Sequence, residues 1–163
     1  MQLNNGKVKM SQDNQRDPLS LENQICFSLY SAANAMVRAY RPLLDRLDLT
    51  YSQYLAMLVL WQHQGISVKT LGEKLHLDSG TLTPLLKRLE AKGLVNRGRS
   101  ELDERVRVLH LTEKGASLRD QALEVPLQMR CKLGGEPEEF AQLKLLCDKA
   151  YRYLDNADKS DKN

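Results

Sequence analysis

The chain has 163 residues, of which 28% are charged, and a formal net charge of +3 at pH 7. This length fits one domain with accessory arms, and the sequence has no apolar run long enough to cross a membrane. The polar N-terminus lacks the apolar core of a signal peptide, so we expect a cytoplasmic protein with no membrane partner. The mild positive charge is compatible with a nucleic-acid partner without requiring one.

The first predicted element is a long amphipathic helix over residues 19–47, after a flexible arm at residues 1–18. Its apolar residues recur at steps of three and four, as in a helix with one buried face. Asp17-Pro18 is a suitable start, since proline fits the first helical turn. Pro42 is expected to kink or end this helix, because it lacks a backbone N–H.

Three shorter helices are predicted next, over residues 48–65, 67–77 and 78–93. Thr50 or Ser52 would cap the first and Ser67 the second, because a hydroxyl at that position accepts a bond from the first turn. Pro84 requires the third to begin close to residues 78–81.

The apolar period then changes from helical to alternating, which predicts a β-hairpin from residues 94–100 and 105–112. Thr112 is expected to cap one helix over residues 112–133, and Glu136-Pro137 to start another that ends near residue 154. The charged tail, residues 156–163, is expected to be disordered.

This order of elements indicates a mostly α fold with a small β-hairpin wing, known as a winged helix-turn-helix, which is a DNA-binding architecture. The amphipathic terminal helices would be left bare in a monomer, so we expect them to pair in a homodimer. The expected organisation is an N-terminal dimerisation helix at residues 19–50, a DNA-binding domain at 51–115 and C-terminal dimerisation helices at 116–155.

In such a fold the second helix of the motif reads double-stranded DNA with its N-terminal residues. The candidate DNA-binding residues of this helix are Ser79, Thr81, Thr83, Lys87 and Arg88. The candidates of the wing are Arg97, Arg99, Arg105 and Arg107. Residues 74–107 hold eight Lys/Arg and five Asp/Glu, a surplus of three positive charges. The plain alternative is a solvated helix beside a charged hairpin.

The stretch "LGEKLHLDSGTLTPLLKRLEAKGLVNRGRSELDERVRVLHLTEKG", residues 71–115, resembles the MarR family of winged-helix repressors. The stretch "LENQICFSLYSAANAMVRAYRPLLDRLDLTYSQYL", residues 21–55, resembles the organic hydroperoxide resistance repressors within that family. The resemblance implies that Cys26 is the peroxide-reactive thiol and that Tyr40 and Tyr51 form hydrogen bonds with it. It further implies the two-cysteine type, in which Cys131 resolves the oxidised thiol by a disulfide between subunits.

The residues themselves set geometric limits on such a site. A peroxide sensor needs a thiolate, which tyrosine hydroxyls stabilise by donating hydrogen bonds. Tyr30 lies four residues after Cys26 on the same helical face. Tyr40 is 14 residues away, about 21 Å along a straight helix, so its contact with Cys26 must come from the partner subunit. Tyr51 could come from either subunit.

The surroundings of the thiol bear on its substrate. The helix dipole is expected to help little, because Cys26 lies beyond the first turn of a helix that begins near Asp17. An apolar surround would favour organic hydroperoxides over hydrogen peroxide. Its candidate residues are Ile25, Phe27, Leu29, Met57 and Trp61. Without the resemblance, Cys26 would be read as a small buried hydrophobe, and Cys147 is expected to be core.

Together these features predict a redox-sensing repressor that binds palindromic operator DNA as a reduced dimer and releases it when Cys26 is oxidised. One alternative is a repressor released by a reversible phenolic or drug-like ligand, and another is a thiol peroxidase. The chain shows neither a thioredoxin-like βαβ pattern nor a Cys/His pair, so we expect no enzyme and no cofactor. His63, His76 and His110 are scattered, which argues against a metal site.

Overall fold

The structure is a computed structural model that describes residues 17–99 and 105–160. Most of the expected N-terminal arm, the tip of the hairpin and residues 161–163 therefore lie outside the described residues. No helix in the described ranges combines the length and the apolar character that a membrane span requires.

The N-terminal helix begins later than expected. A 3-10 turn, η2 (Leu21–Asn23), precedes α1 (Ile25–Leu44), and a second one, η3 (Asp45–Leu47), follows it. The expected start at Asp17 is wrong, because the Asp17 carboxylate accepts the backbone N–H of Leu19 at 2.9 Å and closes a turn instead. Pro42 does not end the helix, which runs through it for two more residues.

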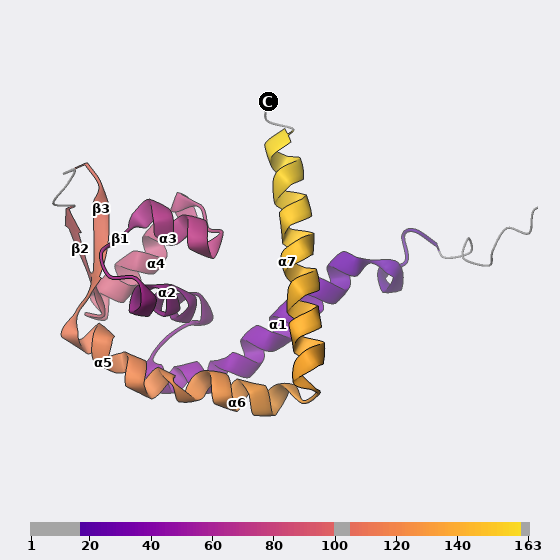
Figure 1. The fold of residues 1–163 in the computed structure, drawn as a ribbon, viewed down its shortest axis with the longest axis horizontal. Helices are drawn as coiled ribbons and strands as arrows, with labels where there is room; N and C mark the ends of the chain where they lie inside the picture. The colour runs from indigo at the N-terminus through magenta and orange to yellow at the C-terminus, as the bar shows by residue number, and fades with distance from the viewer. Residues whose placement is uncertain (1–16, 100–104, 161–163) are drawn as a thin grey trace, which may run out of the picture.

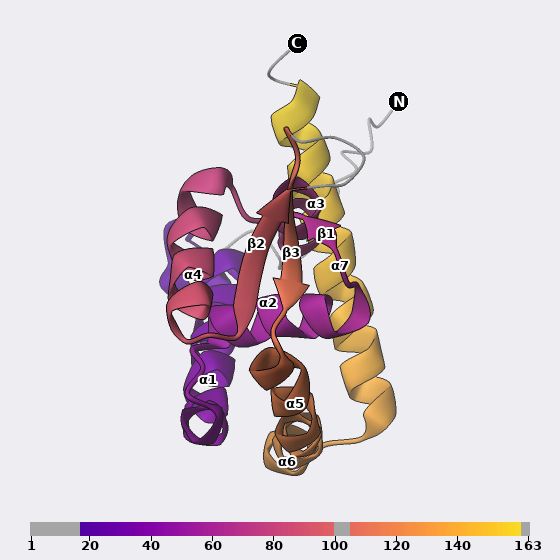
Figure 2. The same cartoon turned by 90° about the vertical axis from the view of Figure 1, so that its left-hand side faces the viewer.

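The central lobe contains the predicted helices and hairpin and one further strand. Its elements are α2 (Tyr51–Gln62), β1 (Ile66–Ser67), α3 (Val68–Leu75), α4 (Ser79–Ala91), β2 (Val95–Arg99) and β3 (Arg107–Leu111). Thr50 forms a capping box with Gln53, and Ser67 caps α3 as predicted. The strands form an antiparallel sheet in the order β1-β3-β2, seen face-on in Figure 2. β1 was not predicted, because two residues are too few to show an alternating pattern.

The core of the lobe lies between the sheet and α2, α3 and α4. Its fully buried side chains include Leu60, Leu71, Leu86, Leu89 and Leu109. Removing such apolar surface from water is the main stabilising contribution to the fold.

The C-terminal part differs from the prediction in two ways. The single helix expected at residues 112–133 is two helices, α5 (Glu113–Ala122) and α6 (Glu124–Leu133), which follow one another end to end in Figure 1. Pro126 explains the break, because it has no N–H to donate to the carbonyl of Ala122. Thr112 caps α5 as predicted.

The last helix, α7 (Pro137–Ser160), extends past the expected end at Leu154 into the tail that was predicted to be disordered. None of its described side chains is buried. Figures 1 and 2 show it rising from the end of α6 beside the lobe and apart from α1. α1 packs against α6 instead.

Candidate functional site

The exposed face of α4 carries the residues predicted to read DNA. Ser79, Thr83 and Lys87 follow one another at steps of four and are all exposed, as is the neighbouring Arg88. The opposite face is buried and consists of Leu82, Leu85, Leu86 and Leu89. This arrangement presents hydroxyl groups first and positive charges one to two turns later, along one edge of the helix.

Thr81 also forms hydrogen bonds with Asp78, the N-cap residue of α4. Its backbone N–H donates to the Asp78 carboxylate at 2.8 Å, and its hydroxyl donates to the other carboxylate oxygen at 3.1 Å. These two bonds, the backbone one first, lower the pKa of Asp78 below its usual range. Because the Thr81 hydroxyl donates its proton to the cap, only its lone pairs remain available to a base or a water.

The wing separates its arginines into two kinds. In the register of β2 and β3, Arg97 lies opposite the buried Leu109, and Arg99 lies opposite Arg107, two residues closer to the hairpin tip. The Arg97 side chain is 26% exposed, and its Nε lies 2.9 Å from the Glu90 carboxylate of α4. Arg97 therefore holds the wing against the reading helix. Arg99 and Arg107 concentrate positive charge on an exposed strand pair, and Arg105 is exposed just before β3.

Three tyrosines from two helices meet beside the lobe. The rings of Tyr40 (α1) and Tyr51 (α2) have centroids 5.0 Å apart, and Tyr40 also lies 5.9 Å from Tyr54 of α2. The predicted pair is therefore brought together within one subunit. Tyr54 is not among the predicted site residues, although its spacing of three residues from Tyr51 on an apolar helix places it on the same face.

Burial raises the pKa of all three hydroxyls in this tyrosine cluster. For Tyr40 the phenol of Tyr51 adds to the effect, and for Tyr51 burial is the only cause. Burial together with the Tyr40 and Tyr51 phenols raises the pKa of Tyr54 to about 12. The cluster thus keeps its protons at neutral pH and can donate hydrogen bonds.

Cys26 is exposed and is the second residue of α1. The expectation that it lies beyond the first turn is therefore wrong, because α1 begins at Ile25. The expected apolar surround is also absent within one subunit: Ile25, Phe27 and Leu29 are exposed large hydrophobics. Met57 is fully buried in the lobe. Tyr30 is 68% exposed, on the same face of the helix as Cys26.

The other two cysteines are exposed and free as well. For Cys147 this contradicts the expected core position, because none of the described side chains of α7 is buried. Cys131 lies near the end of α6, where the Nζ of the next residue, Lys132, donates to the Ala39 carbonyl of α1 at 3.3 Å. Cys131 thus lies beside the stretch of α1 that carries Tyr40.

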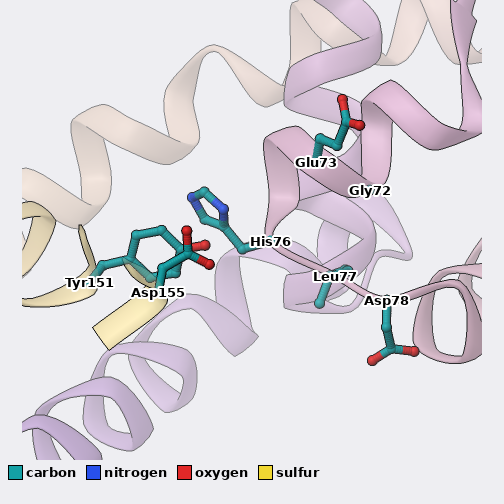
Figure 3. Close-up of a pocket in the computed structure, with 7 residues that line it drawn as sticks. All are labelled: Gly72, Glu73, His76, Leu77, Asp78, Tyr151 and Asp155. Carbon is teal, nitrogen blue, oxygen red and sulfur yellow. The ribbon is translucent and has the colours of Figure 1, made fainter. Parts of the chain in front are cut away.

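Two cavities lie next to predicted site residues or the start of the reading helix. One of about 380 Å³ lies beside Tyr51 and is lined by Arg38 and Arg41 of α1 together with Thr50. The other, of about 470 Å³, lies between the α3–α4 turn and the far end of α7. Figure 3 shows Tyr151 and Asp155 of α7 next to His76, whose ring centroid is 4.0 Å from that of Tyr151. Among the described residues, no group of three His, Cys, Asp or Glu is arranged to hold a metal ion.

Comparisons with known proteins agree with this geometry. Residues 38–122 match the family described as transcriptional regulator SarA/Rot. The organic hydroperoxide resistance transcriptional regulator of Bacillus subtilis (strain 168) is 49% identical over 132 residues, which are 81% of this chain and 90% of that protein. The HTH-type transcriptional regulator TtmR of Methylorubrum extorquens (strain PA1) is 57% identical over 113 residues, 69% of this chain and 58% of that one.

Among solved structures, reduced AbfR bound to DNA superposes with a TM-score of 0.73 at 34% identity, covering 83% of this chain and 93% of that one. AbfR, a Staphylococcus epidermidis protein, has also been solved with its disulfide formed, and that state superposes with a TM-score of 0.60. It covers 80% of this chain and 92% of that one, at 34% identity.

Proposed function

Because the chain belongs to the MarR/SarA family of winged-helix transcriptional regulators, we propose that it is a repressor whose DNA binding is controlled by oxidation of Cys26. The reduced protein binds a palindromic operator as a homodimer in the cytoplasm, and an organic hydroperoxide releases it. The thiol peroxidase alternative is wrong, since the family comprises regulators rather than enzymes.

The exposed edge of α4 and the wing support the DNA-binding part. Ser79, Thr83, Lys87 and Arg88 contact the major groove in this proposal, because they form the outward face of the second helix of the motif. Arg99, Arg105 and Arg107 contact phosphates or the minor groove from the wing. The likeness to AbfR, which has been solved bound to DNA, supports DNA binding by this chain.

Exposed apolar side chains support the homodimer. They gather on α1 and α7, the two helices that leave most of their length uncovered in one subunit. The set comprises Ile25, Phe27, Leu29, Val37, Leu143, Leu145, Leu146, Tyr153 and Leu154. A second copy of the chain would bury this apolar surface, and the two-fold symmetry of such a dimer matches that of a palindromic operator.

The observation that carries the redox proposal is the distance between the thiol and its proposed partners. Cys26 and Tyr40 lie at opposite ends of one continuous helix, α1, about 21 Å apart. The tyrosine cluster and Cys131 share the far end, because Lys132 contacts Ala39. In the proposed dimer, α1 of the partner subunit crosses this end of α1. The partner's Cys26 then lies beside both the tyrosine hydroxyls and the resolving thiol of Cys131.

The proposed chemistry is thiol oxidation followed by condensation. The Cys26 thiolate attacks one peroxide oxygen and the O–O bond breaks. The alkoxide leaves and takes up a proton to form an alcohol, and Cys26 becomes a sulfenic acid. The Cys131 thiolate of the other subunit then attacks that sulfur, the S–O bond breaks, and the departing hydroxide takes up a proton to form water. The resulting disulfide draws α6 of one subunit toward α1 of the other, and the two reading helices leave the spacing that fits one DNA turn.

The test is fluorescence anisotropy of the reduced protein on the palindrome upstream of its own gene, before and after one equivalent of cumene hydroperoxide. Wild type should release the DNA, and Cys26→Ser should stay bound. Cys131→Ser shows whether release needs the disulfide or only the sulfenic acid. Release of Cys26→Ser to the same extent as wild type would exclude the proposal.

The cavity beside Tyr51 favours a second candidate, a reversible phenolic or drug-like ligand. The charged lining of this cavity is Arg38, Arg41 and Asp45, a surplus of one positive charge, which suits an aromatic carboxylate beside Tyr51. In that case salicylate should release Cys26→Ser and wild-type protein equally, and dialysis should restore DNA binding.

A further inference from the structure

The tyrosine cluster contains one member that neither the resemblance nor the proposed chemistry uses. Tyr54 lies one turn after Tyr51 on α2, and its ring packs against Tyr40 with centroids 5.9 Å apart and planes tilted by 40°. Tyr40 also contacts Tyr51, with ring centroids 5.0 Å apart and planes tilted by 50°. The ring of Tyr40 thus packs against two rings of the neighbouring helix.

The three rings differ in burial. Tyr40 and Tyr51 are partly buried and pack against the core from outside, whereas Tyr54 is 3% exposed and belongs to the core itself. A side chain that the core encloses on all sides is held in one rotamer, while a partly buried ring at the end of a helix has more freedom. Tyr54 is therefore the most tightly held member of the cluster, and Tyr40 packs against it.

We propose that Tyr54 is a positioning residue of the thiol sensor: its ring holds Tyr40 and, with it, the hydroxyl that donates to Cys26 of the partner subunit. This inference rests on the proposed function. The ring of Tyr54 does this by contact with Tyr40, and Tyr54 itself does not touch the sulfur. Loss of the Tyr54 ring frees Tyr40 to rotate away, and the thiolate then loses a hydrogen-bond donor.

The raised pKa of Tyr54 agrees with this role. Burial and the neighbouring phenols raise it to about 12, so Tyr54 carries no charge that could act on the thiol at neutral pH. Tyr54 therefore acts through the shape of its ring and not through a charge. Phenylalanine, which keeps the ring, should replace it, and leucine, which does not, should fail.

The experiment measures the rate of Cys26 alkylation by iodoacetamide against pH in the full-length reduced protein, with Cys131 and Cys147 changed to Ser. Tyr54→Leu should move the midpoint of this profile up by about one pH unit, which is about a tenfold loss of thiolate at pH values below the wild-type midpoint. It should slow oxidation by cumene hydroperoxide to a similar extent. Tyr54→Phe should keep the wild-type profile.

Leu60→Val, another core change on α2, is the matched control, since it loosens the same helix away from the cluster. It should lower the melting temperature and leave the midpoint in place. A wild-type midpoint in Tyr54→Leu would overturn the inference, and so would a Tyr54→Phe midpoint displaced as far as that of Tyr54→Leu.

Tyr40→Phe distinguishes failure of the proposed function from failure of this inference. If Tyr40→Phe leaves the midpoint unchanged, the proposed tyrosine site is wrong, and the inference is then wrong as well. If Tyr40→Phe moves the midpoint and Tyr54→Leu does not, only the inference fails.

Discussion

Lys92, the residue that follows the reading helix, forms an ion pair with Asp48 at the junction of α1 and α2, with Nζ 2.9 Å from Oδ1. The same Nζ also donates to the carbonyl of Asp48. Lys114 of α5 in turn donates to the Lys92 carbonyl at 2.8 Å. The end of α4 is thereby tied to a point three residues before Tyr51. This link joins the proposed sensor to the DNA-reading helix through a short run of named contacts.

Replacing Lys92 by Met should weaken the response of DNA binding to oxidation. The ratio of operator affinity between the reduced and the oxidised protein should fall by about 2- to 30-fold, the range seen when one coupling residue is lost. Operator anisotropy of both redox states measures that ratio. Lys69→Met is the control, because Lys69 is exposed and pairs with Glu73 of the same helix, on the outer surface of α3. An unchanged ratio in Lys92→Met would show that the signal travels by another route.

Arg97 and Arg107 should differ in the salt dependence of DNA binding. Arg107→Ala removes a proposed phosphate contact, so the slope of log K against log salt should fall by about 0.9. Arg97→Ala breaks the contact with Glu90 and misplaces the wing, so affinity should fall with the slope unchanged. Anisotropy titrations over a series of salt concentrations distinguish the two. A slope that falls in Arg97→Ala would place Arg97 on the DNA.

The cap of the reading helix should make stability depend on acid pH. Hydrogen bonds from Thr81 lower the pKa of Asp78 in the folded state. The cap therefore stabilises the fold fully above the unfolded pKa, about 3.9, and loses its effect as pH falls through the folded pKa. Asp78→Asn should melt a few degrees below wild type at pH 7, and the gap should close toward pH 2. A gap that is independent of pH would contradict the ionised cap.

The tyrosine cluster should make stability depend on alkaline pH. The pKa of Tyr54 is raised to about 12 in the folded state, so the buried neutral phenol stabilises the fold below about pH 10. That contribution is lost as pH rises through the folded pKa. Denaturant unfolding between pH 9 and about 12 should show wild type losing stability faster than Tyr54→Phe, which has no proton to release. Equal losses in the two proteins would mean that Tyr54 ionises freely.

The exposed face of α7 should hold the dimer together. Leu146→Glu places a charge among apolar residues that a second copy would cover, so it should shift the protein toward monomer in sedimentation velocity. Lys144→Ala, which removes an exposed charge paired with Asp148, should leave the dimer intact. Its DNA affinity should also be unchanged, whereas Leu146→Glu should lose affinity for a palindrome. A Leu146→Glu protein that sediments as wild type would remove α7 from the interface.

Local features of the sequence predicted most of the lobe. Ser67, Asp78 and Thr112 begin helices because a short polar side chain satisfies the first backbone N–H groups, a property of neighbours three residues apart. Pro126 is a local signal for the break between α5 and α6. The predicted start of α1 is wrong because Asp17-Pro18 suits a turn as well as a helix.

The sequence did not predict the contacts between helices and strands. Arg97 and Arg107 are alike in the sequence, and only the packing of β2 against α4 shows that Arg97 pairs with Glu90, whereas Arg107 lies opposite Arg99, closer to the hairpin tip. The sequence by itself determined the element types, the exposed edge of α4 and the presence of the cysteines and tyrosines, because those depend on periodicity and near neighbours. The tertiary structure alone decided that Tyr40, Tyr51 and Tyr54 meet and that Cys131 lies at their end of α1. Such contacts depend on how two helices pack, and no local pattern encodes that packing.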